Sequence, residues 1–292
     1  MLRDEETKIV SHVDAGSGYR FLVLDAPKLA ADLVPGQFVH VRIPGLEASA
    51  LRRPFSVFDA ADGRVTVMYK IVGRGTEALA RAQVGDAVKV EGPLGHGFPA
   101  TCTGTPLLVG GGYGVAPLHF LARRFVAAGL KPVLSLGGRP QDDLLWQPAC
   151  PSISLQPCPL LFVGGRTKDD LLALDRFAAL GVDVRTATND GSAGAKGFVT
   201  EPLDAELAAL RQTGTPFELF TCGPDGLLKA VAQRALDAGR PGWISMDRHM
   251  VCGVGACFAC IQPVRLPNGE VSNARCCVNG PVFKAEEIVW SI

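Results

Sequence analysis

Hydrophobic and β-branched residues in the first hundred positions alternate with polar ones over short runs. Alternation with a period of two indicates strands that bury one face. Pro35-Gly36 and Asp62-Gly63 supply turns, and one helical run, residues 76–82, interrupts the series. The expected strands cover residues 8–13, 20–25, 37–43, 54–58, 64–72 and 87–91. Six strands and one helix predict a small closed antiparallel β-barrel. We expect this barrel domain to cover residues 1–102.

From residue 106 onward, short apolar runs alternate with helical ones. Alternation of strands and helices is typical of a parallel α/β sheet. The expected strands cover residues 107–109, 160–163, 183–187 and 217–221, and the expected helices cover residues 117–128, 170–180 and 226–238. The pattern predicts an α/β domain over residues 103–242 and a third, small domain over residues 243–292.

Residues 133–145 and 160–172 are two copies of one sequence, identical at eight of thirteen positions. A solenoid needs more than two copies, so we interpret the pair as a local duplication. Residues 146–159 carry four prolines and two cysteines, which predicts an irregular connector. The sequence leaves open which copy forms a central strand, although the second leads into a cleaner helix.

Charge and composition narrow the class of protein. The 29 basic and 29 acidic residues give no excess that would indicate a nucleic-acid partner or an anionic membrane. No apolar run approaches the length of a spanning helix, and the first residues lack the apolar core of a signal peptide. Five of the nine cysteines lie within residues 252–277, which favours metal ligation over a disulfide framework. We therefore expect a soluble cytosolic protein.

The clustered cysteines carry the most specific chemistry. Cys252, Cys257 and Cys260 have the spacing Cys-x4-Cys-x2-Cys, and Cys276 and Cys277 follow at a distance. This spacing with a distant fourth cysteine is that of a [2Fe–2S] cluster. Glycines between the first cysteines let the backbone curl around the inorganic sulfides. Structural zinc is the alternative, although zinc sites usually use two separated Cys-x2-Cys pairs.

A first cofactor motif opens a predicted barrel strand. Arg52-Arg53-Pro54-Phe55-Ser56 resembles the Arg-x-(Tyr/Phe)-Ser signature of the ferredoxin-reductase family. The resemblance implies that Arg53 meets the FAD pyrophosphate as a bidentate donor. It also implies that Pro54, Phe55 and Ser56 line the isoalloxazine, with the serine hydroxyl near flavin N5. The alternative is an exposed arginine pair beside an ordinary strand.

A second motif follows at the distance that the family implies. Met68, Tyr69 and Lys70 lie in the predicted strand over residues 64–72, and Gly75 and Thr76 begin a helix. Amide groups at a helix start can hold a phosphate. The alternative is a glycine turn with a threonine N-cap. The two motifs together predict FAD.

Two further motifs lie in the α/β domain. Gly110, Gly111, Gly112 and Gly114 occupy a strand-to-helix connection, where the absence of side chains lets a dinucleotide pyrophosphate approach the backbone. The sequence Cys222-Gly223-Pro224 ends the last predicted strand. It resembles the family's Cys-Gly-Pro motif beside the nicotinamide, and the alternative is a helix entry with a buried cysteine.

The choice between NAD and NADP stays open. Arg139 and Arg166 each follow a Gly-Gly pair, and either could face the adenosine ribose. No acidic residue clearly marks a free 2′-hydroxyl. We take NAD as the expected nucleotide, with NADP not excluded.

Taken in order, these motifs cover nearly the whole chain. With Asn-Asp-Gly-Ser at residues 189–192 and the ending Cys-Val-Asn-Gly-Pro-Val-Phe, the chain resembles the electron-transfer subunits of class 1B dihydroorotate dehydrogenases. The resemblance implies that the ligands are Cys252, Cys257, Cys260 and Cys277. Cys276 is the alternative to Cys277, and Asn279 replaces the family's usual Asp.

The resemblance also implies the activity. In the family, an FMN-containing barrel subunit oxidises dihydroorotate, and electrons pass through the cluster to FAD and then to NAD, within a heterotetramer. Ser56 and Cys222 are then the expected catalytic residues. One rival function is the reductase component of a sulfide or oxygenase complex. Another is a degenerate reductase-like module that holds structural zinc.

Overall fold

The computed structural model describes residues 1–46, 51–130 and 159–290. The described chain divides into two compact units. The barrel unit comprises Met1–Phe98, Ala116–Leu121 and Trp243–Ile292, and the sheet unit comprises Pro99–Val115 and Ala122–Gly242. The division into three domains, one for each cofactor, stays a prediction.

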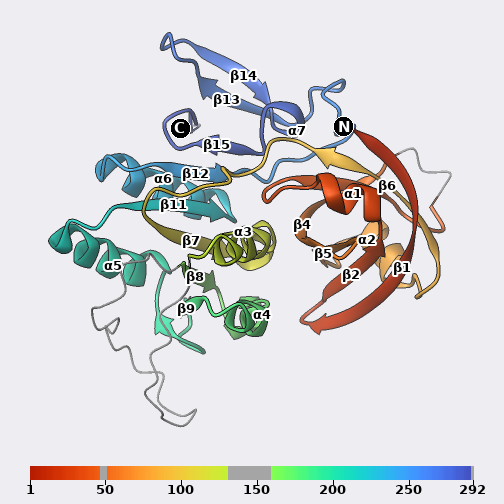
Figure 1. The fold of residues 1–292 in the computed structure, drawn as a ribbon, viewed down its shortest axis with the longest axis horizontal. Helices are drawn as coiled ribbons and strands as arrows, with labels where there is room; N and C mark the ends of the chain where they lie inside the picture. Colours follow the sequence, from red (N-terminus) through yellow and green to blue (C-terminus); the bar gives the residue numbers. More distant parts are fainter. Residues whose placement is uncertain (47–50, 131–158, 291–292) are drawn as a thin grey trace. The chain divides into compact units, whose positions relative to one another are not determined.

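The predicted barrel is confirmed. Six antiparallel strands close in the order β1-β2-β5-β4-β3-β6 (Figure 1). Their bounds are β1 Arg3–Gly16, β2 Tyr19–Asp25, β3 Phe38–Arg42, β4 Arg53–Ala61, β5 Arg64–Lys70 and β6 Ala87–Leu94. Alternate residues of each strand point inward, as a period of two requires. Val39, Val41, Val57, Val65 and Val67 fill the interior and have no exposed surface.

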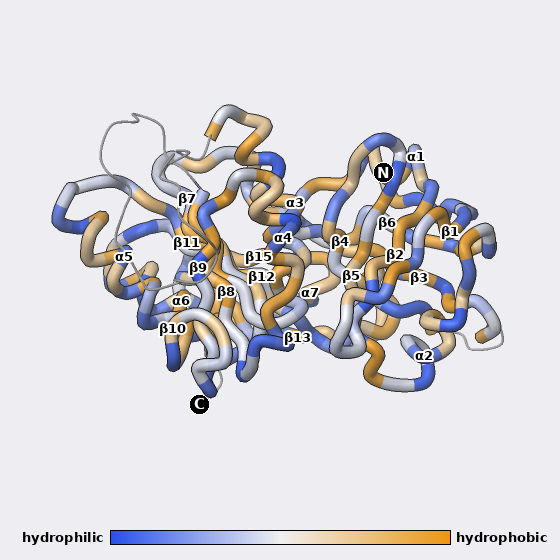
Figure 2. The backbone as a smooth tube through the Cα atoms, turned by 90° about the horizontal axis from the view of Figure 1, so that it is seen from below, coloured by the Kyte–Doolittle hydropathy of each residue, from blue (hydrophilic) through white to orange (hydrophobic). Residues whose placement is uncertain are grey.

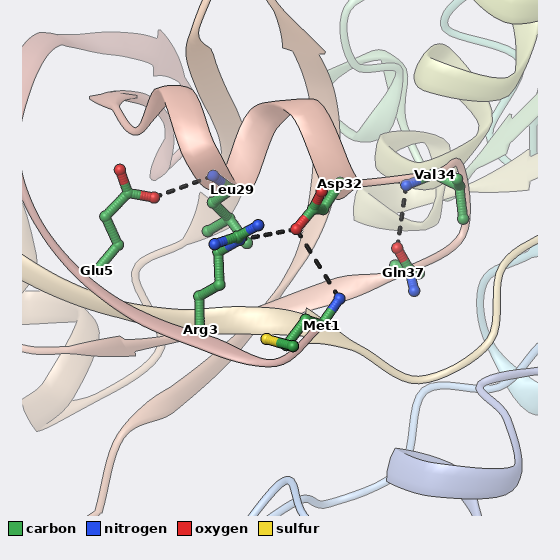
Figure 3. Close-up of polar contacts among 7 residues, drawn as sticks. All are labelled: Met1, Arg3, Glu5, Leu29, Asp32, Val34 and Gln37. Atoms are coloured by element: carbon green, nitrogen blue, oxygen red, sulfur yellow. Dashed lines mark hydrogen bonds and ion pairs between the residues drawn. The ribbon is translucent and has the colours of Figure 1, made fainter.

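Helix α1, Pro27–Asp32, was not predicted. It has six residues, too few to show a helical period, and the structure ties it to the start of β1 (Figure 3). Glu5 accepts the Leu29 amide at 3.0 Å, and Arg3 Nε donates to Asp32 at 2.7 Å. Leu29 is fully buried in the barrel core. These long-range contacts stabilise a helix that its own sequence does not specify.

The second helix of the barrel unit, α2, runs over Arg74–Ala80, where residues 76–82 were predicted. It begins two residues earlier, so Gly75 lies inside its first turn.

The C-terminal segment packs on the barrel within the same unit. It contains the antiparallel pair β12, Gly242–Ser245, and β15, Val282–Lys284, together with the hairpin β13, Ile261–Arg265, and β14, Val271–Arg275, and the short helix α7, Cys276–Asn279. The backbone amide of His96, just after β6, donates to the carbonyl of Gly280. The approach is close: a β-carbon on Gly95 would lie 2.6 Å from that carbonyl oxygen.

The predicted parallel sheet is also confirmed. In the sheet unit, five strands pair in parallel in the order β10-β9-β8-β7-β11. They are β7 Thr105–Gly111, β8 Leu160–Gly165, β9 Asp183–Thr188, β10 Ala195–Lys196 and β11 Phe217–Cys222. The strands β7, β8 and β11 are largely hydrophobic (Figure 2). This is expected of strands covered on both faces.

The connections between these strands differ in part from the prediction. Helices α3, Val115–Ala127, and α6, Asp225–Asp237, lie within two residues of their predicted bounds. The predicted helix over residues 170–180 is wrong in extent. A 3₁₀ turn, η2, covers Lys168–Asp170, and α4 covers only Leu174–Ala179. The left-handed conformation of Ala173, with φ of 56°, separates the two because it cannot continue a right-handed helix.

Helix α5, Thr200–Thr213, was not predicted although its signal was present. Leu203, Leu207 and Leu210 are buried at helical spacing. The second copy of the duplication forms β8, between β7 and β9. The first copy and all but the last residue of the connector lie outside the described residues. None of the described helices is long and apolar enough to span a membrane.

Candidate functional site

Arg53 and Gly75 meet at the start of α2. A β-carbon on Gly75 would lie 2.7 Å from Arg53 Nε and 3.3 Å from Nη2. On its other side, Arg53 Nη1 donates to the backbone carbonyls of Leu51 and Arg52, at 3.1 and 3.2 Å. The guanidinium is therefore held in place by backbone while Nε and Nη2 form no hydrogen bond with another described residue. Such a group suits an anionic ligand at this point.

The neighbouring arginine has a different role. Arg52 forms ion pairs with Asp4 at 2.7 Å and with Glu91 at 3.7 Å. Its charge is therefore neutralised within the barrel, whereas Arg53 has no carboxylate partner among the described residues. Of the two arginines, Arg53 is the one suited to meet a phosphate.

Thr76 organises the turn before α2. Its Oγ1 accepts the amides of Val72 at 2.9 Å and Gly73 at 3.2 Å and donates to the Gly73 carbonyl at 3.0 Å. The Thr76 hydroxyl thus forms its hydrogen bonds with backbone groups. The alternative prediction made this threonine the N-cap, whereas the N-cap is Gly73 and Thr76 is the third residue of the helix. Its contacts do not preclude phosphate binding by backbone amides.

Tyr69 lies inside the barrel. Its hydroxyl is 2.8 Å from His12 Nε2, while His12 Nδ1 is 2.9 Å from the carbonyl of Ala82. Because a carbonyl only accepts, Nδ1 must carry the proton, and Nε2 then accepts from the tyrosine hydroxyl. Burial raises the pKa of Tyr69 to about 12. The Phe55 ring packs 5.5 Å away from the Tyr69 ring, so both rings belong to the core.

Ser56 and Pro54 lie on the outer face of β4. Phe55, which lies between them, and Val57, which follows Ser56, point into the core. The pairing register places Phe38 opposite Ser56 and His40 opposite Pro54. Ser56 and Pro54 remain half-exposed. Met68 and Lys70 alternate with the core residues of β5 in the same way, and Lys70 Nζ lies 4.6 Å from the centre of the Tyr19 ring. A planar ligand could lie along Pro54 and Ser56.

In the sheet unit, the glycine loop packs against the Cys-Gly-Pro turn. Strands β7 and β11 pair so that Gly110 is opposite Cys222. A β-carbon on Gly114 would lie 2.4 Å from the Cys222 carbonyl oxygen, and one on Gly111 would lie 2.9 Å from Pro224 Cδ. These two glycines are required by the contact between the loops. Gly112, with φ of 54°, has no atom within 4 Å of a β-carbon position and leaves open space for a ligand.

Cys222 and Gly223 are placed by the same contact. Cys222 is 4% exposed at the end of β11, and Gly223 adopts φ of 153° beside the Gly111 amide. Both motifs lie at the carboxyl ends of adjacent parallel strands, where α/β sheets bind their ligands. The arrangement agrees with a dinucleotide site.

Arg166 follows β8 at the same edge of the sheet. Its side chain is 81% exposed and lies 3.6 Å from Asp170. Nearby, Ser192 donates to Asp190 through its hydroxyl at 2.7 Å and its amide at 2.9 Å. These hydrogen bonds lower the pKa of Asp190. Arg166 is therefore exposed at this edge of the sheet, whereas Arg139 lies outside the described residues.

The cysteine loop turns its backbone amides toward Cys252. Burial acts to raise the pKa of this thiol, but hydrogen bonds from the Cys257 amide and thiol, and from the amides of Val254 and Ala256, bring it down to about 7. Gly253 and Gly255 have φ of 73° and 81°, a conformation that favours glycine. The loop is built to stabilise negative charge on sulfur, which a thiolate ligand requires.

Cys276 and Cys277 both lie close to Cys260, but only the Cys277 thiol hydrogen-bonds to a thiol of the loop. The Cys277 thiol hydrogen-bonds to the Cys260 thiol and accepts the Gly255 amide, and its own amide lies 3.4 Å from Cys260 Sγ. Burial raises the pKa of Cys277 to about 12, and it does the same for Cys276. Cys276 is completely buried beside Arg248 and has no hydrogen bond to a thiol of the loop.

The four predicted ligands therefore meet in two pairs, Cys252 with Cys257 and Cys260 with Cys277. Among the described residues, no three His, Cys, Asp or Glu side chains surround one metal-ion position. A [2Fe–2S] cluster held by four cysteines needs two thiolates for each of two irons. The residues present fit that group.

Two supporting contacts of the loop were not predicted. Arg275 Nη1 donates to the Gly255 carbonyl at 2.9 Å, and its guanidinium lies 5.0 Å from the centre of the Phe258 ring. Asn279 Oδ1 accepts the Arg275 amide at 3.0 Å. An Asp at this position would offer the same acceptor, so the replacement noted in the sequence keeps the contact.

Two family models match the chain. The model of the oxidoreductase FAD-binding domain matches residues 6–98. The model of the iron-sulfur cluster binding domain of dihydroorotate dehydrogenase B matches residues 247–289. These matches agree with the barrel and with the C-terminal cysteine segment, and they confirm that the chain has an FAD-binding barrel and an iron–sulfur cluster binding segment.

The chain is similar to known proteins over most of its length. The dihydroorotate dehydrogenase B (NAD(+)) electron transfer subunit of Geobacillus kaustophilus is 38% identical over 260 residues, which cover 87% of this chain and 86% of that protein. The corresponding subunit of Bacillus mycoides is 35% identical over 99% of this chain and 100% of that protein.

Solved structures also resemble the chain. The structure of an NADH-dependent reduced ferredoxin-NADP oxidoreductase aligns with a TM-score of 0.76 at 29% identity, over 97% of this chain and 90% of that one. An Amycolatopsis cytochrome P450 reductase aligns with a TM-score of 0.61 at 23% identity, over 81% of this chain and 66% of that one. The second likeness concerns the fold alone.

Proposed function

Because the chain belongs to the family of dihydroorotate dehydrogenase B (NAD(+)) electron transfer subunits, we propose that it carries electrons from dihydroorotate oxidation in a partner subunit to NAD⁺. The chain is an FAD and iron–sulfur oxidoreductase subunit that works with NAD, and the activity belongs to pyrimidine biosynthesis. In such a protein, the cluster passes single electrons and the flavin joins them into a hydride, while the polypeptide binds and orients these groups.

The observation that best supports the proposal is the pairing of the four thiols across the cysteine loop. Cys252 and Cys257 form one pair and Cys260 and Cys277 the other. We assign these four residues as the cluster ligands. Cys276 stays the alternative fourth ligand, and the contacts of Cys277 with Cys260 and Gly255 favour Cys277.

For FAD, we assign Arg53 to the pyrophosphate. Its guanidinium lies beside Gly75 and has no carboxylate partner among the described residues, and the turn fixed by Thr76 adds backbone amides. We assign Pro54, Ser56 and the backbone of Phe55 to the isoalloxazine, since the Phe55 side chain points into the core. Met68, Tyr69 and Lys70 support it from β5, with Tyr69 anchored by His12.

For the nicotinamide nucleotide, we assign the backbone of Gly110, Gly111, Gly112 and Gly114 to the pyrophosphate. Cys222 and the following Gly223 and Pro224 lie at the neighbouring strand end, where we expect the nicotinamide. The exposed guanidinium of Arg166 is a candidate for the adenosine ribose. NAD is the nucleotide of the related subunits by name.

The name of the relatives also implies a catalytic partner subunit. We propose that this partner contains FMN and that the two chains form a heterotetramer. A cytoplasmic location, expected from clustered reduced cysteines, is part of the same proposal.

Cofactor analysis of the purified protein tests the assignment. We expect two irons, two acid-labile sulfides and about one FAD per chain, since four cysteines bind one [2Fe–2S] cluster. Anaerobic NADH should bleach the flavin absorbance. A colourless protein with stoichiometric zinc would instead favour the structural-zinc module, and a flavin that NADH cannot reduce would contradict the nucleotide assignment.

A further inference from the structure

His40 is a buried histidine that contacts the cysteine loop. It lies in β3 on the outer face of the barrel, and 1% of its surface is exposed. Its Nε2 is buried and has no hydrogen-bond partner among the residues that the structure describes. A buried polar atom without a partner destabilises the folded state. Such an atom in a well-packed position calls for a ligand or a functional reason.

The face of the ring lies against Gly253, the residue after Cys252, with Cε1 nearest and the two nitrogens on either side of it. A β-carbon on Gly253 would lie 2.6 Å from Cε1, 2.8 Å from Nδ1 and 3.0 Å from Nε2 of His40. Only a glycine permits this approach. The imidazole therefore lies directly against the loop that holds the first cysteine.

On the neighbouring strand β4, the residues paired with β3 belong to the predicted flavin site. The pairing of β3 with β4 sets His40 opposite Pro54 and Phe38 opposite Ser56, all on the outer face of the barrel. The Phe38 ring packs 5.6 Å from the His40 ring at an angle of 60°. On the remaining strand, Glu91 of β6 is opposite His40. His40 thus lies next to Pro54, which is assigned to FAD, and next to Gly253, which follows the assigned cluster ligand Cys252.

The ring is a neutral hydrogen-bond donor. Burial lowers the pKa of His40 to about 4, and the positive charge of Arg52 lowers it further. A neutral imidazole carries one N–H. Hydrogen bonds from N–H groups to cluster sulfurs are one of the factors that set the potential of an iron–sulfur cluster.

From this geometry we propose that His40 donates a hydrogen bond through Nε2 to the sulfur-rich group held by the cysteine loop and so sets its reduction potential. The inference rests on the proposed function, because it needs a [2Fe–2S] cluster at Cys252. Reduction adds one electron and one negative charge to the cluster. A donor directed at its sulfur stabilises the reduced state, so this bond raises the midpoint potential.

Redox titration of the purified full-length protein, followed by electron paramagnetic resonance, tests the proposal. His40→Phe keeps the ring packing and removes the donor. We expect the reduced-to-oxidised equilibrium to shift at least about tenfold toward the oxidised state, which is about 59 mV more negative for one electron. His40→Gln places an amide N–H near the position of Nε2 and should recover part of the shift.

His249→Phe is the matched control. His249 is exposed three residues before Cys252, where solvent screens its dipole, so this variant should keep the midpoint of the unchanged protein. An unchanged midpoint in His40→Phe with full iron content would overturn the inference. So would a shift of equal size in His249→Phe.

A measurement on the unchanged protein covers the case in which the variants lose their cluster. With ¹⁵N in the histidine rings, the reduced cluster should show a weak ¹⁵N coupling in pulsed electron paramagnetic resonance, and this coupling should persist in His249→Phe. A cluster signal without ring-nitrogen coupling would refute the role of His40 and leave the proposed function intact. Complete absence of a [2Fe–2S] signal would contradict the proposed function itself.

Discussion

The guanidinium of Arg53 lies against Gly75, so closely that a β-carbon at residue 75 would be 2.7 Å from Nε. The two residues come from different elements, β4 and α2, and the contact exists only because residue 75 has no side chain. The backbone carbonyls of Leu51 and Arg52 hold the opposite side of the guanidinium. This arrangement presents the remaining N–H groups of Arg53 to a ligand in a fixed orientation.

Arg53→Ala should weaken FAD binding by about 1.5–3 kcal/mol, the usual value of a charge-assisted hydrogen bond. This corresponds to roughly a 10- to 150-fold higher Kd, which flavin titration of the apoprotein measures. Arg52→Ala is the matched control, because Arg52 pairs with Asp4 and Glu91 and should affect only stability. Equal losses of affinity in both variants would contradict the assignment of Arg53.

Cys277→Ser should abolish the visible absorbance of the cluster, while Cys276→Ser should keep it. The reason is that the Cys277 thiol meets Cys260 across the loop, whereas the Cys276 thiol is buried beside Arg248. Absorption spectra and iron content of the two purified variants provide the comparison. The reverse pattern would make Cys276 the fourth ligand.

Gly114→Ala should destabilise the sheet unit by about 1–3 kcal/mol, as overpacking in a close contact does. Its β-carbon would lie 2.4 Å from the Cys222 carbonyl oxygen, so the glycine loop and the Cys-Gly-Pro turn must separate. NADH binding should weaken with the loss of stability. Gly226→Ala, where the new β-carbon would meet no other described part of the chain within 4 Å, is the control that should lower neither, because alanine is favoured over glycine in a helix.

The free energy of unfolding should fall between pH 10 and 12. Tyr69 in the folded protein has its pKa raised to about 12 by burial, whereas an unfolded tyrosine ionises near pH 10. The extra stability is therefore fully present below pH 10 and is lost as the pH rises through the folded pKa. Two pKa units correspond to at most about 3 kcal/mol.

Urea unfolding at several alkaline pH values measures this dependence. Tyr69→Phe should flatten the curve above pH 10, while Tyr113→Phe, at an exposed position, should keep the slope of the unchanged protein. An undiminished slope in Tyr69→Phe would show that another group causes the loss.

Much of the fold follows from local patterns in the sequence. The alternation of residues such as Val65 and Val67 with polar neighbours predicted β5 and its inward face, and the cysteine spacing predicted the metal-binding loop. Helix α1 could not be predicted, since its stability depends on Glu5 and Arg3 of a distant strand. Helix α5 could have been found from the spacing of its buried leucines.

The roles of individual site residues depend on contacts that no motif encodes. Nothing near His40 in the sequence indicates that it touches Gly253, because the contact joins the barrel to the far end of the chain. Likewise, two adjacent arginines look equivalent until the structure shows Arg52 in ion pairs and Arg53 beside Gly75. Tertiary packing decided both cases.

The most direct test of the central claim is the anaerobic dihydroorotate:NAD⁺ activity of the purified chain, with and without an FMN-containing dihydroorotate dehydrogenase catalytic subunit. We expect NADH formation only when both proteins are present. Activity of the chain alone would contradict the division of labour between the subunits. Absence of activity with the catalytic subunit, in a protein whose flavin NADH still reduces, would contradict the assignment to dihydroorotate oxidation.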